Sequence, residues 1–162
     1  MGIVEEFRFE SMADPEDPDD WRPDTEWALV IDPGGPGGTV RDLSMILEHI
    51  APGDAIPLHR HPGDEAVVLE AGALEYRLGD STRTIEAGAI VFIPRGTPHG
   101  CRNVGESEAR IHAVFPTEVL AIEYLERNPK PGTEGDPPSP PWWVDVRALR
   151  DAEASGPAPP PA

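Results

Sequence analysis

The feature that most constrains the fold of this chain is a series of short apolar segments, closely spaced and separated by turns that contain glycine or proline. Segments of this kind are typical of strands, and no long helical pattern lies between them. They occur at nine places: residues 27–31, 43–50, 56–60, 65–70, 73–78, 82–86, 90–93, 99–103 and 108–115. The spacing predicts an all-β fold, either an antiparallel sandwich or a barrel.

One segment after these strands has a helical pattern instead. In residues 118–127 (EVLAIEYLER), Val119, Ile122 and Leu125 recur at three-residue spacing. This spacing would place the three side chains on one side of a helix. We therefore expect a short capping helix on the outside of the barrel.

The apolar residues are concentrated in the middle of the chain. Leu, Ile, Val and Phe make up 24 of the 84 residues from Leu43 to Glu126, but only 11 of the other 78. A chain of 162 residues has room for one domain. We predict an acidic N-terminal arm at residues 1–26, a barrel with its capping helix at 27–127, and a proline-rich C-terminal tail at 128–162.

Both ends have compositions typical of extended segments. The first 42 residues carry 12 acidic and three basic residues, and the acidic cluster between Asp14 and Asp20 is interrupted by prolines. This pattern predicts a solvated arm. Ten of the 21 prolines lie between Pro129 and Pro161, where Trp142 and Trp143 precede VDVRALRDAE. The tail is therefore expected to be extended, with a short helix packed against the barrel.

The overall charge narrows the range of partners. Thirteen basic residues against 30 acidic ones give a net charge of −17, which would repel nucleic acid and anionic membranes. Cys101 is the one cysteine, so no internal disulfide can form. The N-terminal sequence MGIVEEFRFE lacks the pattern of a signal peptide, and no run of 18 apolar residues occurs. The expected location is the cytoplasm.

The candidate chemistry lies in the histidines. His59 and His61 are two residues apart in a strand pattern, so both imidazoles would project from the same face. Glu65 begins the next strand and His99 lies on a later one. Three imidazoles and one carboxylate suit a divalent transition metal and leave two positions of an octahedron open. By itself, however, the His-x-His pair is more typical of two surface histidines beside a turn than of a metal site.

Two longer motifs include these four residues. Residues 53–72 (GDAIPLHRHPGDEAVVLEAG) fill every specified position of the pattern G-x5-H-x-H-x3-E-x6-G. Residues 88–103 (GAIVFIPRGTPHGCRN) likewise fill G-x5-P-x-G-x2-H-x3-N. The chain is identified from these two motifs as a member of the cupin superfamily, and the resemblance extends over about residues 43–116.

The resemblance implies a jelly-roll barrel with a metal held by His59, His61, Glu65 and His99. It further implies turn roles for the motif glycines, a structural role for Asn103, and a homodimer. We expect Trp27–Ile31 to pair with the second subunit, because this segment is apolar and distant in sequence from the motifs. We expect Fe(II), and Ni(II), Mn(II) and Zn(II) are alternatives because the ligand types alone do not select one metal.

Three functions are compatible with such a barrel. The segment VFPTEVLAIEYLER is similar to small quercetinase-like cupins, which implies an oxygenase that oxidises or cleaves a small metal-chelating organic substrate. Glu65 would then be both a ligand and the catalytic base. The first alternative is a metal-dependent isomerase or polyketide-type cyclase, in which the metal is a Lewis acid. The second is a small-molecule-binding cupin without turnover.

Several further residues have open assignments. Cys101 shares the phase of His99 and is either a small buried residue or a thiol near the metal. His112 is inward only if Ile111 is outward, and His49 is similarly undecided against its neighbour Glu48. Apolar cavity walls are expected from Val67, Leu69 and either Phe92 or Phe115, and surface ion pairs from Arg60 and Arg95.

Overall fold

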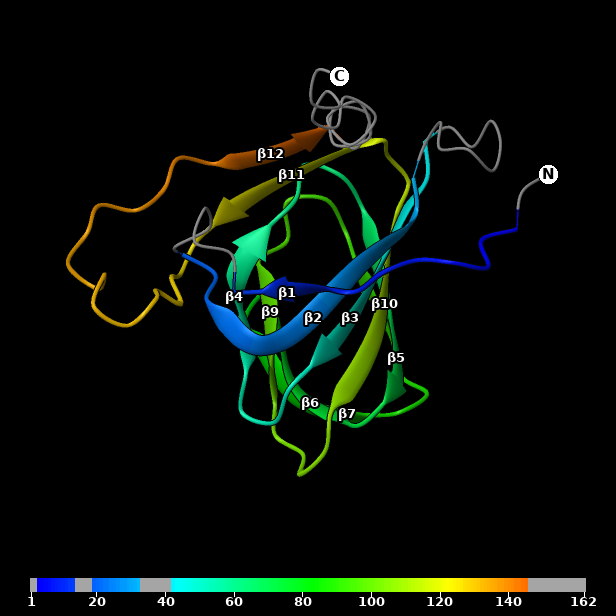
Figure 1. Cartoon of the computed structure of the whole chain (residues 1–162), viewed down its shortest axis with the longest axis horizontal. Coiled ribbons are helices and arrows are strands. Elements are labelled where there is room, and N and C mark those ends of the chain that lie inside the picture. Colours follow the sequence, from blue (N-terminus) through cyan, green and yellow to red (C-terminus); the bar gives the residue numbers. More distant parts are fainter. Residues whose placement is uncertain (1–2, 14–18, 33–41, 146–162) are drawn as a thin grey trace, which may run out of the picture.

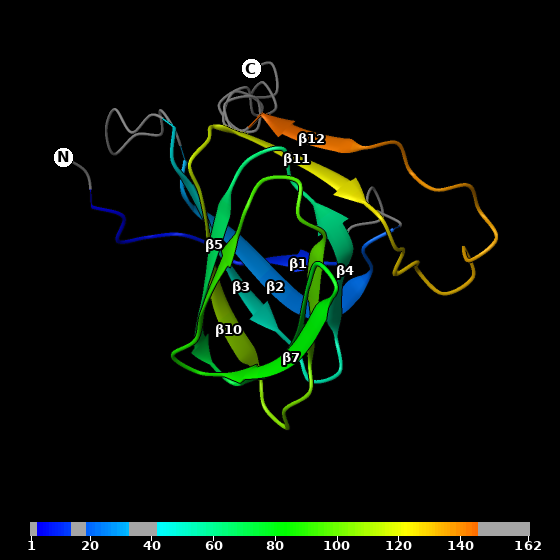
Figure 2. The same cartoon turned by 180° about the vertical axis from the view of Figure 1, so that it is seen from behind.

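A computed structural model describes residues 3–13, 19–32 and 42–145. Its strands form two six-stranded sheets, and all strand neighbours pair antiparallel. The first sheet contains, in spatial order, β1 (Glu10–Met12), β2 (Arg22–Ile31), β3 (Ser44–Ile50), β10 (Ala109–Phe115), β5 (Glu65–Ala71) and β8 (Ile90–Ile93). The second contains β12 (Trp142–Asp145), β11 (Val119–Tyr124), β4 (Ala55–Arg60), β9 (His99–Asn103), β6 (Ala73–Leu78) and β7 (Ser81–Glu86). Together they make a jelly-roll barrel (Figures 1 and 2).

The barrel confirms the all-β prediction, and all nine expected strands are present. The largest shift of a boundary is in β2, which begins at Arg22 rather than at Trp27. The extra residues include Thr25, which is fully buried, and Arg22, whose side chain is held by ion pairs. Arg22 and Thr25 are polar and lie in an acidic stretch. The apolar pattern therefore placed the predicted start of this strand too late in the sequence.

The predicted capping helix at residues 118–127 is wrong, because the segment forms strand β11. Glu123 and Tyr124 pair with Arg60 and His59 of β4, and on its other side β11 pairs with β12. The segment contains valine, isoleucine and tyrosine, which favour strands. The edge of β4 offers backbone hydrogen-bonding groups that a strand can pair with and a helix cannot. This pairing outweighs the helical preference indicated by the three-residue spacing.

The core lies between the two sheets and follows the alternation of the strands. Inward residues of β5 and β10 are buried, among them Val67, Leu69, Ile111 and Phe115. The connection from β5 to β6 passes close to β10 at Gly72, whose φ is 85° and where an added Cβ would lie 2.7 Å from the Cα of Ala109. A side chain there would be strained and would collide with backbone.

The ends of the chain differ from their predictions in two places. Asp19 and Asp20 belong to the arm that we expected to be solvated, yet both are buried. They are buried because arginines neutralise them: Asp20 pairs with Arg22, and Asp19 with Arg127. In the tail, Trp142–Asp145 form strand β12 in place of the start of a helix, and the rest of the predicted helix lies outside the described residues.

The segment chosen for dimer pairing is partly occupied within the chain. Strand β3 pairs with it on one side, and on the other side β1 reaches only as far as Trp27 in the register of the sheet. The homodimer itself stays a prediction. Large apolar side chains are exposed elsewhere, at Ile90 and Phe92 of the edge strand β8.

Within the described ranges, no helix has the length and the apolar character needed to cross a membrane.

Candidate metal centre

Four buried side chains meet at one end of the barrel. His59 is near the end of β4, His61 follows that strand, Glu65 begins β5 and His99 begins β9. Their relative exposures are 8%, 7%, 5% and 2%, respectively. One potential ligand atom from each residue lies within 4.8 Å of all the others. The structure thus brings together the four residues that the motifs single out.

Backbone carbonyl groups fix the orientation of all three imidazole rings. Nδ1 of His59 lies 2.8 Å from the carbonyl oxygen of Pro57, and Nδ1 of His99 lies 2.9 Å from that of Thr97. Nδ1 of His61 lies 2.7 Å from the carbonyl oxygen of Ala121, in β11. A carbonyl only accepts, so each Nδ1 carries the proton. The unprotonated Nε2 of each ring is left for the centre, as is usual for metal-ligating histidines.

The carboxylate of Glu65 faces two of these Nε2 atoms. Its Oε2 lies 2.9 Å from Nε2 of His99 and 3.5 Å from Nε2 of His61. Oε2 of Glu65 and Nε2 of His99 are fully buried and have no hydrogen-bond partner in the described part of the chain. With the Nδ1 tautomers above, all these atoms are acceptors. Buried acceptors that face one another need a cation between them, so the donor set fits a divalent metal.

The electrostatics keep the rings of His59 and His61 neutral. Burial lowers the pKa of His59 well below its usual value, and the neighbouring His99 and His61 lower it further. Burial also lowers the pKa of His61, against the opposing effect of Glu65. A neutral imidazole is the form that binds a metal, so these two ligands are ready to bind at neutral pH.

An aromatic ring lies beside the centre on the side of β10. The ring of Phe115 lies edge-on to His61, with 5.2 Å between the centroids. Val67 and Leu69 are buried in the core, and their place in a cavity wall stays a prediction. Phe92 is not part of it, because 64% of this residue is exposed on the outer face of β8. The strand alternation turns Phe92 outward, opposite to its neighbour Ile93, and this settles the choice in favour of Phe115.

The structure also settles Cys101. It belongs to the buried core and is not among the clustered ligand atoms. Burial raises the pKa of its thiol to about 12. A protonated, buried thiol is a poor ligand and a poor nucleophile, so Cys101 is a small core residue.

The two other histidines lie outside the centre. Nε2 of His112 is 3.3 Å from Oε2 of Glu70, so Ile111 is the inward residue. His49 stacks on Phe9, with 4.0 Å between ring centroids. Because neighbours in a strand face opposite sides, Glu48 is the inward residue.

The remaining motif residues have structural contacts. Arg60 donates two hydrogen bonds to Glu123, of 2.6 and 2.9 Å, on the surface. Nε of Arg95 lies 3.8 Å from Asp64. The side-chain amide nitrogen of Asn103 donates to the carbonyl groups of Ile50 and Ser107. The expected surface pairs and the structural role of Asn103 are therefore present.

Sequence reasoning missed a buried ion cluster beside β3. Arg22 donates two hydrogen bonds to Asp20, of 2.8 and 2.7 Å, and one of 3.1 Å to Glu48. Only 3% of the Arg22 side chain is exposed. The one available signal was a lone arginine within an acidic run, next to an apolar strand. The carbonyl partners of the imidazoles were also missed, because every residue has a backbone carbonyl and the residue type does not show which one contacts a histidine.

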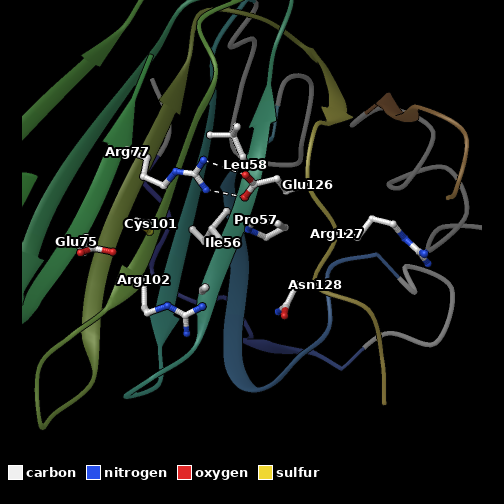
Figure 3. Close-up of a pocket in the computed structure, with 11 residues that line it drawn as sticks. Ile56, Pro57, Leu58, Glu75, Arg77, Cys101, Arg102, Glu126, Arg127 and Asn128 are labelled. Atoms are coloured by element: carbon white, nitrogen blue, oxygen red, sulfur yellow. Dashed lines mark hydrogen bonds and ion pairs between the residues drawn. The ribbon is translucent and has the colours of Figure 1, made fainter. Parts of the chain in front are cut away.

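A separate pocket of about 300 Å³ lies on the outer face of the second sheet. Arg77 and Glu126 pair across it through two hydrogen bonds, of 2.6 and 2.9 Å (Figure 3). None of the four clustered residues lines this pocket. It is therefore distinct from the candidate metal centre.

Known proteins resemble this chain in the barrel region. The family described as "Cupin domain" matches residues 46–115. Protein SchB of Streptomyces halstedii is 38% identical over 73 residues, which are 44% of this chain and 51% of SchB. The chain thus matches about half the length of that relative. The tetracenomycin polyketide synthase protein TcmJ of Streptomyces glaucescens is 29% identical over 114 residues, which are 67% of this chain and 74% of TcmJ.

A solved structure supports the same fold. The polyketide cyclase RemF of Streptomyces resistomycificus superposes with a TM-score of 0.56 at 22% identity, over 78% of this chain and 80% of RemF. Both sequence motifs are complete, the two sheets form the jelly-roll barrel, and the family match covers its central strands. Residues 46–115 match the cupin domain, and the barrel that contains them has the jelly-roll cupin fold.

Proposed function

We propose that this chain is a metal-dependent enzyme that cyclises a small, enolisable substrate of the polyketide type. The observation that carries the proposal is the buried set of three Nε2 atoms and one carboxylate, with acceptors that face one another. The names of TcmJ and RemF, a polyketide synthase protein and a polyketide cyclase, support the choice of substrate class.

The residues that would hold the metal are His59, His61, Glu65 and His99. A bound divalent metal would supply Lewis acidity, which eases the loss of a proton from a chelated 1,3-diketone or phenol. The chain itself would orient the substrate and exclude water, because Phe115, Val67 and Leu69 form apolar surroundings. Fe(II), Ni(II), Mn(II) and Zn(II) all suit the donor set, and Fe(II) is the metal we expect.

The oxygenase predicted from the motifs is the second candidate. Four protein ligands leave two positions of an octahedron, enough for both a substrate oxygen and O₂. Glu65 would then be ligand and base. Cyclisation is placed first because it needs no oxidant and agrees with the named relatives.

The experiment is a turnover assay on metal-loaded protein with a linear poly-β-ketone and, in parallel, a flavonol. Products are identified by mass spectrometry in air, under nitrogen and under ¹⁸O₂. We expect cyclised product that has lost water, formed at equal rates with and without oxygen. A strict requirement for oxygen with incorporation of the label would replace cyclisation by oxygenation. Stoichiometric binding without turnover would favour the binding-protein alternative.

A further inference from the structure

Glu48 is a second carboxylate on the inner face of the barrel. It lies in the middle of β3, two residues from Ile46 and Ile50, both of which pack in the core. In the register of the sheet, Glu48 is opposite Ile111, which is also buried in the core. Because side chains alternate along a strand, Glu48 points into the same interior as these apolar residues.

A buried arginine holds this carboxylate by one oxygen. Nη1 of Arg22 donates to Oε2 of Glu48 at 3.1 Å, and Arg22 is itself fixed by two hydrogen bonds to Asp20. The hydroxyl of Tyr124 lies 3.4 Å from Oδ2 of Asp20. Among the described residues, the other oxygen of Glu48, Oε1, accepts no hydrogen bond, and 14% of the side chain is exposed. Glu48 is thus oriented and still accessible.

The cluster is electrostatically coupled to the candidate metal centre. Burial raises the pKa of Glu48, Arg22 lowers it, and the charges of Asp20 and Glu65 raise it again. The charge of Arg22 in turn contributes to the lowered pKa of His59. The geometry agrees: the ring of Tyr124, whose hydroxyl reaches Asp20, lies 6.4 Å from the ring of His59 between centroids. The cluster therefore adjoins the candidate metal centre, and Glu48 is outside the ligand set.

We propose that Glu48 is the group that takes up and returns the substrate proton in the cyclisation, with Arg22 as its positioning residue. This inference rests on the proposed function. In the step, a C–H proton between two carbonyl groups moves to Oε1 of Glu48, and its electron pair stays on the substrate as an enolate. The enolate carbon bonds to a second carbonyl carbon, whose oxygen becomes an alkoxide. The proton returns from Glu48 to that alkoxide, and the resulting hydroxy ketone loses its hydroxyl group and a neighbouring hydrogen as water. No oxidant or reductant is needed.

Glu65 is a weaker candidate for this proton. Its Oε2 faces Nε2 of both His61 and His99 and would be committed to the metal. A carboxylate whose lone pair is shared with a cation is less basic than a free one. Glu48 has an oxygen that no described residue binds. If Glu65 holds the metal and Glu48 moves the proton, neither carboxylate has to do both.

The test uses the full chain loaded with Zn(II) and acetylacetone as the probe. Hydrogen–deuterium exchange at the carbon between the two carbonyls is followed by NMR, and probe binding is measured by calorimetry. The variant is Glu48→Gln, whose amide oxygen can still accept from Arg22. The matched control is Glu70→Gln, an acidic residue on the outer face of β5. Metal content and thermal midpoint are recorded for each protein.

We expect Glu48→Gln to retain one equivalent of metal and to bind the probe. The central carbon of the bound probe should exchange its hydrogen at least about 100-fold more slowly than with the unchanged protein. Glu70→Gln should match the unchanged protein. Exchange by Glu48→Gln at the unchanged rate overturns the role of Glu48 and leaves the proposed function standing. If the unchanged protein holds metal but neither binds nor exchanges the probe, the proposed function fails, and the role of Glu48 fails with it.

Arg22→Lys separates positioning from a purely structural role. Lysine keeps the charge but not the bidentate geometry. We expect the affinity for the probe to be unchanged and exchange to slow by about tenfold, an effect smaller than that of Glu48→Gln. A lowered thermal midpoint with unchanged exchange would show that Arg22 is structural only.

Discussion

Two buried ionic clusters of this barrel differ in how their charges are balanced. In the cluster of Asp20, Arg22 and Glu48, the guanidinium group supplies a cation and hydrogen bonds to both carboxylates. In the cluster of Glu65 with the three histidines, Oε2 of Glu65 and Nε2 of His99 lie 2.9 Å apart without a shared hydrogen bond. The first cluster is complete as the chain folds. In the second, the facing acceptors have no hydrogen-bond donor among the described residues, and a divalent metal fits as the balancing charge.

The largest effect should come from breaking the complete cluster. Arg22→Ala leaves the buried carboxylates of Asp20 and Glu48 without a counter-charge. We expect the free energy of unfolding, measured by urea denaturation, to fall by about 3–5 kcal/mol. Metal stoichiometry should stay at one per folded chain. A loss below about 1 kcal/mol would mean that water neutralises this cluster and that it is not truly buried.

In the cluster of Glu65 and the three histidines, the loss of one member should lower metal affinity and leave the fold intact. His61→Ala removes one Nε2 donor, and we expect metal affinity to fall by more than about 100-fold, because even the loss of an outer partner of a ligand typically costs 10–100-fold. The fold should be retained, as judged by circular dichroism. Equal metal content in the variant and in the unchanged protein by elemental analysis would remove His61 from the site.

Acid should destabilise the metal-free protein through the same histidines. The pKa values of His59 and His61 are lowered in the fold, so the unfolded chain takes up protons first, near pH 6.5. Stability is therefore full above about pH 6.5 and is lost as the pH falls from there toward their folded-state pKa values. Each histidine contributes a slope of up to about 1.4 kcal/mol per pH unit.

The matched variant for this pH effect is the pair His59→Gln and His61→Gln. Denaturation midpoints measured from pH 7.5 to 5 should flatten in this double variant. A profile as steep as that of the unchanged protein would assign the acid sensitivity to other groups.

The smallest effect is expected at an exposed ion pair. Arg60 lies between His59 and His61 in sequence but points outward to Glu123. Solvent screens such pairs, so Arg60→Ala should change neither the denaturation midpoint nor metal content measurably. A loss of metal in this variant would show that the surface pair positions the neighbouring imidazoles.

The contrast between the clusters also explains what could be predicted from the sequence. The strand pattern and the two motifs predicted the barrel and the grouping of His59, His61, Glu65 and His99, because these signals are local and closely spaced. The helix predicted at residues 118–127 failed because pairing with β4 decided its structure. That same strand supplies the Ala121 carbonyl that orients His61.

The missed features depend on contacts between distant segments. Arg22 and Glu48 are 26 positions apart and meet only when β2 and β3 pair. Nothing in either residue type marks the contact. His49 and Glu48 were equally plausible inward residues until the register was known.

X-ray absorption spectroscopy of the metal-loaded protein tests the central claim most directly. The account predicts one metal per chain, with a first shell of nitrogen and oxygen atoms and the multiple-scattering signature of three imidazoles. No sulfur should be present, since Cys101 is a buried core thiol. A shell with one imidazole or none, or one that contains sulfur, would contradict the assignment of His59, His61, Glu65 and His99 as the metal centre.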